Sequence, residues 1–81
     1  MRRMTLYTRP GCHLCEEAEG LLAALAADFG WEINERDITT DPMLWERFRY
    51  RVPVVAVDDT VLLYPPITSE RLLAALAEGS R

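Results

Sequence analysis

Both cysteines of the chain lie in one short stretch, Tyr7 to Glu17 (YTRPGCHLCEE), where His13 and Leu14 separate Cys12 from Cys15. Two thiols at this spacing can form a reversible redox couple, half of a metal site or a small structural disulfide. Structural zinc centres usually need four ligands, and the one histidine of the chain lies between the cysteines, where it is poorly placed for shared chelation. We therefore favour the redox couple and keep an intersubunit metal or iron–sulfur site and an inert crosslink as alternatives.

Composition limits the kind of protein that can carry this pair. The chain has 81 residues, of which 49% are hydrophobic, so we expect one small domain over residues 1–81. Thirteen acidic against nine basic residues argue against nucleic acid as the main partner. Because no apolar stretch approaches a signal sequence or a membrane span, we expect a cytoplasmic monomer that does not bind membranes. Cytosolic thiols are kept reduced, which disfavours a structural disulfide.

The apolar pattern predicts the elements that must position the two cysteines. The expected elements are, in chain order, a strand at Met4–Thr8, a helix at Cys12–Phe29, a strand at Trp31–Ile38 near a sheet edge, a helix at Pro42–Tyr50, a central strand at Val54–Val57, an Asp58-Asp59 turn, a strand at Thr60–Tyr64, and a helix that starts at Thr68 or Ser69 and closes at Gly79. The order β-α-β-α-β-β-α begins with a right-handed βαβ unit and ends with a hairpin and a helix. It predicts an α/β fold with a mixed four-stranded sheet and helices on both faces.

A position at the start of the first predicted helix would give the two thiols different roles. Unpaired N–H groups and the positive end of the helix dipole stabilise a thiolate there, so they favour a lowered pKa for Cys12. Cys15 lies one turn further along on the same side, close enough to form a disulfide but more shielded. We therefore predict Cys12 as the attacking thiol and Cys15 as the resolving thiol.

Some charged neighbours of Cys12 favour its thiolate, and others oppose it. Arg9 precedes it by three residues and His13 follows it directly, so both are candidates to stabilise its thiolate. The ordinary alternative for both side chains is a solvated surface position. Three acidic residues of the same region oppose a second negative charge on sulfur: Glu16, Glu17 and Glu19.

With these residues the chain resembles the glutaredoxin and thioredoxin superfamily, and it looks most like short bacterial glutaredoxin-like proteins. The similarity rests on Tyr7-Thr8-Arg9-Pro10-Gly11-Cys12-x-x-Cys15, on Val52-Pro53 before an apolar strand, and on the order of elements over nearly the whole chain. The resemblance implies a thioredoxin-like fold of the glutaredoxin type. It also implies a cis Val52–Pro53 bond that faces the cysteines, and a substrate-binding role for Val52 and Pro53.

Several positions depart from the glutaredoxin pattern. His13-Leu14 replaces Pro-Tyr, and Arg51 replaces Thr. Residues 64–70 (YPPITSE) replace the Gly-Gly and the Ser/Cys-Asp pair that holds the amino-acid end of glutathione. We therefore do not transfer those glutathione contacts, and we expect no bound cofactor or metal, with glutathione kept as a candidate reductant or co-substrate. Three basic side chains near Pro53 form either a candidate strip for anionic partners or a solvated face: Arg47, Arg49 and Arg51.

The predicted function is thus a thiol–disulfide oxidoreductase that reduces protein or small-molecule disulfides through Cys12 and Cys15. Its expected partners are a disulfide-containing protein or a small thiol, together with a reductase or a glutathione system that restores the dithiol. The alternative is a non-catalytic module that binds a partner, or an intersubunit metal or iron–sulfur cluster, through Cys12.

Overall fold

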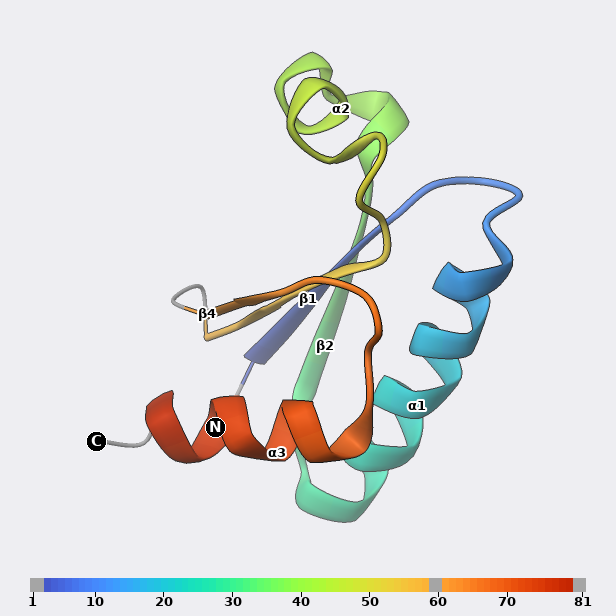
Figure 1. Ribbon diagram of the computed structural model, residues 1–81. Helices are drawn as coiled ribbons and strands as arrows, with labels where there is room; N and C mark the ends of the chain where they lie inside the picture. The colour runs from blue at the N-terminus through green and yellow to red at the C-terminus, as the bar shows by residue number, and fades with distance from the viewer. Residues whose placement is uncertain (1–2, 59–60, 80–81) are drawn as a thin grey trace.

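The computed structural model describes residues 3–58 and 61–79, with side chains described up to residue 76 (Figure 1). Its elements are β1 (Arg3–Thr8), α1 (His13–Phe29), β2 (Glu32–Asp37), the short 3-10 helix η1 (Ile38–Thr40), α2 (Pro42–Phe48), β3 (Val54–Val57), β4 (Val61–Leu63) and α3 (Ser69–Gly79). The predicted element order is confirmed, with η1 as an addition.

The four strands form one mixed sheet in the order β2-β1-β3-β4. β1 runs parallel to β2, while β3 lies antiparallel to both β1 and β4, so that Leu6 faces Val55 and Val55 faces Leu63. All four residues of β3 are buried, which confirms the central strand expected from its continuous apolar run. β2 lies at an edge, as its alternating apolar and charged residues predicted.

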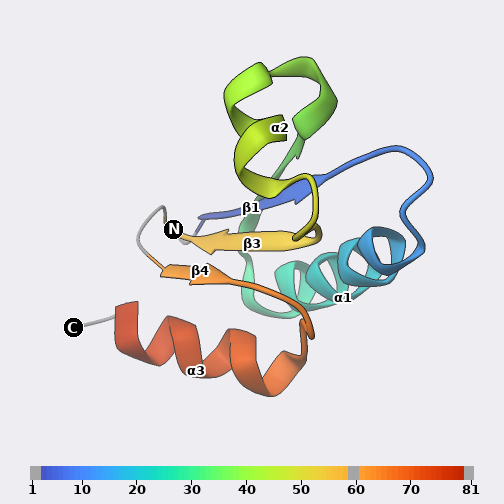
Figure 2. The ribbon, with the colours of Figure 1, turned by 45° about the horizontal axis from the view of Figure 1, so that its top comes forward.

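Helices cover both faces of the sheet, as predicted. Figure 2 shows α1 and α3 on one face and α2 on the other. Because side chains alternate along a strand, Leu6 and Val55 enter the core beneath α1 and α3, and Val54 enters the core beneath α2. Each large aliphatic side chain buried in this way contributes about 1.5–3 kcal/mol to folding. The two cores fix α1 and the segment before β3, the two elements that carry the candidate site.

Some element boundaries differ from those predicted. Ile38 belongs to η1 rather than to the second strand, because the Asp37 carboxylate accepts hydrogen bonds from the backbone N–H (2.8 Å) and the hydroxyl (2.6 Å) of Thr39 and so starts a turn. The helix predicted to reach Tyr50 ends at Phe48, whose carbonyl accepts the N–H groups of Arg51 and Val52.

The last strand is shorter than expected, whereas the last helix has the predicted bounds. β4 covers Val61–Leu63, and Asp59 of the predicted turn and Thr60 of the predicted strand lie outside the described residues. α3 begins at Ser69, and the Thr68 hydroxyl accepts the Arg71 N–H at 3.2 Å. Of the two residues considered for the helix start, Thr68 therefore acts as the cap.

Candidate redox site

Cys12 is the N-cap of α1, directly before the first helical residue, His13. Its backbone is extended (φ −96°, ψ 107°), and its Sγ accepts a hydrogen bond from the Cys15 N–H at 3.1 Å. Gly11, with φ of 75°, provides the left-handed turn that brings the chain from β1 into the helix. The sulfur therefore lies at the positive end of the helix, with a backbone donor directed at it. This is a setting that stabilises a thiolate.

The two cysteines are joined by a disulfide, and their Cα atoms lie 5.2 Å apart. Their surroundings differ, because Cys12 is half-buried whereas Cys15 is only 2% exposed. Solvent and large substrates therefore reach the sulfur of Cys12 more easily than that of Cys15. This asymmetry matches the predicted division between an attacking and a resolving thiol, although those roles remain predictions.

The two candidate thiolate-stabilising residues lie on either side of Cys12. His13 is strongly exposed, with Nδ1 3.7 Å from the Glu16 carboxylate and Nε2 3.9 Å from the Glu17 carboxylate. A protonated His13 would therefore share its charge with two carboxylates. Arg9 is exposed in the loop before α1 and lines a cavity together with Cys12.

The second predicted part of the site precedes β3. The Val52–Pro53 peptide bond is cis, which confirms the expectation from the family resemblance. Pro53 is buried, and the Val52 N–H donates to the Phe48 carbonyl at 3.2 Å. That N–H is therefore already paired within the chain, and a substrate-binding role for Val52 and Pro53 stays a prediction.

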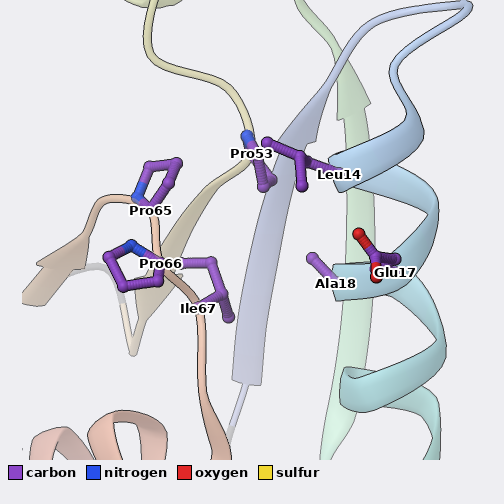
Figure 3. A pocket seen from close by; sticks show the side chains of 7 residues that line it. All are labelled: Leu14, Glu17, Ala18, Pro53, Pro65, Pro66 and Ile67. Carbon is purple, nitrogen blue, oxygen red and sulfur yellow. The ribbon is translucent and has the colours of Figure 1, made fainter.

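One cavity of about 420 Å³, which we call the proline groove, connects α1 with the segment before β3 and the loop after β4. Figure 3 shows Leu14, Ala18 and Glu17 along α1, Pro53 near Leu14, and the loop residues across the cavity. Its lining residues are Leu14, Glu17, Ala18, Pro53, Pro65, Pro66 and Ile67. The contribution of the loop was missed from the sequence, where Pro65-Pro66 signalled only the end of a strand.

A second cavity of about 370 Å³, which we call the acidic groove, opens beside Cys12. It is lined by the residues from Thr8 to Cys12 and by four carboxylates: Glu16, Glu19, Glu35 and Asp37. Partial removal from water raises the pKa of Glu35, and the charge and hydrogen bond of Glu19 raise it further. Hydrogen bonds from the Thr39 hydroxyl and N–H lower the pKa of Asp37. Cys12 therefore has an acidic neighbourhood on this side.

Replacing Glu35 with glutamine should stabilise the fold at pH 7. A carboxyl whose pKa is raised by folding binds protons more strongly in the native state, so its ionised form lowers stability above that pKa. The gain should therefore vanish as the pH falls below 4.5, the ordinary pKa of this side chain. Urea unfolding of wild type and variant at pH 7 and near pH 4 measures the difference in their free energy of unfolding at each pH.

The partner of Glu35 offers a control for this prediction. Because Glu19 is a smaller cause of the raised pKa of Glu35 than removal from water, Glu19→Gln should give a smaller gain than Glu35→Gln, and the double variant should gain less than the sum. Gains that add fully, or that persist unchanged at low pH, would contradict this explanation.

The three arginines of the candidate basic strip each lie against an aromatic ring. The guanidinium carbons of Arg47 and Arg49 lie 4.9 Å from the Phe48 ring and 4.7 Å from the Tyr50 ring. That of Arg51 lies 5.5 Å from the ring of Tyr64. Among the described residues that line the two grooves, Arg9 is the one arginine.

Within residues 3–58 and 61–79, no group of three or more His, Cys, Asp or Glu side chains is arranged to hold a metal ion. None of the helices in the same part of the chain combines the length and the apolar character needed to cross a membrane. A metal or iron–sulfur cluster shared between two subunits would take ligands from a second chain, so it stays a hypothesis.

Three features together define a thioredoxin-like protein. They are the mixed four-stranded sheet with helices on both faces, the Cys-x-x-Cys disulfide at the start of the first helix, and the cis proline before β3. Within that class, the chain belongs to the glutaredoxin-like family: the family model described as "Glutaredoxin-like domain (DUF836)" matches residues 3–77.

The chain is also similar over most of its length to several proteins of known sequence or structure. Two uncharacterized proteins, Rv0508 of Mycobacterium tuberculosis and Mb0520 of Mycobacterium bovis, are each 30% identical over 96% of this chain and 86% of their own. The crystal structure of XcR50 from X. campestris matches with a TM-score of 0.77 and 35% identity, over 93% of this chain and 96% of that one. The solution structure of Ne2328 from Nitrosomonas europaea matches with a TM-score of 0.77 and 29% identity, over 91% and 89%.

Proposed function

We propose that this protein is a thiol–disulfide oxidoreductase that reduces disulfides of proteins or small molecules. The observation that carries this proposal is the position of Cys12 as the N-cap of α1, with the Cys15 N–H directed at its sulfur and Cys15 buried behind it. A structural crosslink needs neither a partly exposed Cys12 nor a difference in burial between the two cysteines. The family assignment supports a redox role of this kind.

The proposed reaction begins with the dithiol form. The Cys12 thiolate attacks one sulfur of the substrate disulfide, whose S–S bond breaks as a Cys12–substrate disulfide forms and one substrate thiolate leaves. Cys15 then loses its proton and attacks the Cys12 sulfur, which releases the second substrate thiolate and forms the Cys12–Cys15 disulfide. Two electrons thus pass from the protein to the substrate, and the two protons of the pair become available to the released thiolates.

An external thiol system must restore the dithiol in this scheme. A dithiol reductase or the glutathione pool can supply the two electrons by the reverse exchange, with no cofactor bound to the protein. We place the protein in the cytoplasm as a monomer, since the cytosolic thiol pool keeps such pairs reduced. Arg9 and His13 are proposed to adjust the pKa of Cys12, and Val52 and Pro53 to contact the substrate.

The test of this function is a redox titration of the Cys12–Cys15 pair. The proposal requires one reversible transition that involves two electrons, at a potential that cellular thiol systems can reach. A pair that stays oxidised throughout that range would support the inert crosslink instead.

A further inference from the structure

Two grooves with different chemistry open along the first turns of α1, where the two cysteines lie. The acidic groove reaches Cys12 and carries four carboxylates. The proline groove reaches Leu14, the residue between His13 and Cys15, and six of its seven lining residues are apolar. A peptide joined to Cys12 can extend over one of these surfaces, so their difference bears on which protein disulfides are favoured.

The far wall of the proline groove is held in place by α3. The Arg71 guanidinium donates hydrogen bonds to the backbone carbonyls of Tyr64 and Pro66, on either side of Pro65. Ile67, which follows, packs against the core beneath α1 and α3. The loop is therefore anchored at both ends, and the groove is an existing surface that needs little rearrangement to bind a ligand.

The charges around the proline groove disfavour an anionic ligand. Among the described residues that line it, Glu17 is the one ionisable side chain. Glutathione carries two carboxylates and one ammonium group, so glutathione disulfide has a net charge of −2. A carboxylate placed here would lose water without gaining a cation, and it would meet the negative charge of Glu17.

An apolar side chain of a ligand, in contrast to a carboxylate, would bind favourably in the proline groove. Leu14 is 57% exposed, and Pro65 and Pro66 are exposed too, so a ligand that covers these three side chains removes apolar surface from water. The cavity of about 420 Å³ falls within the usual range for binding sites and has room for one large side chain. The Val52 carbonyl, beside Pro53, can accept a backbone hydrogen bond from the same segment.

We propose that the proline groove binds an apolar side chain next to the reacting cysteine of an extended peptide, so that the preferred substrates are protein disulfides with apolar neighbours rather than glutathione disulfide. This inference rests on the proposed oxidoreductase function and adds a substrate class to it. The exchange steps and their electron balance are unchanged, with an external dithiol as the reductant.

The test compares four disulfides as substrates of the reduced protein. Two are symmetrical disulfides of blocked peptides, acetyl-Leu-Cys-Leu-amide and acetyl-Ser-Cys-Ser-amide, which are uncharged and differ in apolar surface. The third is glutathione disulfide, and the fourth is bis(2-hydroxyethyl) disulfide, a small neutral probe of the exchange chemistry. Single-turnover oxidation of the protein gives a rate constant for each at low substrate concentration.

For wild type we expect the leucine peptide to react about tenfold faster than the serine peptide, because one large side chain is buried in the groove. Glutathione disulfide should react more slowly than the leucine peptide. In Leu14→Ser the preference for the leucine peptide should fall several-fold. Because each preference is a ratio within one variant, a changed reactivity of Cys12 cancels out. Equal rates for the two peptides, or glutathione disulfide as the fastest substrate, would overturn the proposal.

Glu17 and Glu16 form a matched pair that identifies the groove in use. Both are exposed, both lie near His13 in the first turns of α1, and they line the proline groove and the acidic groove respectively. Glu17→Lys should raise the rate with glutathione disulfide several-fold relative to bis(2-hydroxyethyl) disulfide in the same variant, and Glu16→Lys should raise this ratio less. A larger rise in Glu16→Lys would place the substrate in the acidic groove and refute the proposal.

The neutral probe separates failure of this inference from failure of the proposed function. If bis(2-hydroxyethyl) disulfide oxidises the protein but the two peptides react equally, the oxidoreductase function stands and the substrate class is wrong. If none of the four disulfides oxidises the protein, the function itself is wrong.

Discussion

Reduced protein with Cys15 replaced by serine should accumulate a mixed disulfide with a peptide substrate through Cys12. The outer sulfur can still attack the substrate, but the thiol that would release the product is missing. Mass spectrometry after an acid quench should show most of the protein carrying one peptide, and proteolytic mapping should place that peptide on Cys12. Wild-type protein should instead proceed to the Cys12–Cys15 disulfide with no adduct that persists.

The matched variant is Cys12→Ser, which keeps one thiol of the same pair. Cys15 is 2% exposed and is not at the helix start, so the yield of adduct should fall by at least about a hundredfold at pH 7. Similar adducts in both variants would refute the assignment of an attacking Cys12 and a resolving Cys15.

Replacing Phe48 with alanine should cause the largest loss of stability among single substitutions in the core beneath α2. Phe48 is 1% exposed, packs with Ile38 and Val54, and lies 4.9 Å from the ring of Tyr7. Truncation of a buried phenylalanine leaves a cavity and costs about 3–5 kcal/mol. That is a large part of the roughly 5–15 kcal/mol that holds a small domain folded. Urea unfolding at pH 7 measures the difference.

Tyr50 provides the control for this substitution. It is an aromatic residue two positions after Phe48, just beyond the end of α2, and it is 85% exposed. Tyr50→Ala should therefore change stability by less than about 1 kcal/mol. If both variants lost the same free energy of unfolding, the core beneath α2 would not be the support that the structure indicates.

The sequence predicted the fold well where local patterns are strong. The apolar run Val54–Val57 identified a central strand, because a strand buried on both faces is continuously apolar. The helical periodicity after Cys12 identified α1, because a helix buried along one side has apolar residues every three or four positions. Errors appeared where a polar side chain ends an element. Asp37 starts a turn by accepting hydrogen bonds from Thr39, and so it removes Ile38 from the strand in which its apolar character had placed it.

The site was predicted in part for a similar reason. Cys12 and Cys15 are close in the chain, so the helix geometry that relates them could be inferred locally, and Val52-Pro53 was identified through the family resemblance. The two grooves could not be inferred, because each combines segments that only the tertiary fold brings together. Leu14 lines one cavity together with Pro53 and Pro66, and Glu19 on α1 interacts with Glu35 on β2, and no local sequence pattern predicts either arrangement.

A redox titration of the Cys12–Cys15 pair tests the central claim most directly. The protein is equilibrated anaerobically with graded ratios of oxidised and reduced thiol buffer, quenched by acid and alkylated, and the fraction with two free thiols is read by mass. We predict one transition with a midpoint between about −270 and −120 mV, in which the oxidised-to-reduced ratio changes tenfold for about 30 mV. A pair that remains a disulfide below about −300 mV, or that never closes under oxidising conditions, would contradict the account of Cys12 and Cys15 as a redox couple.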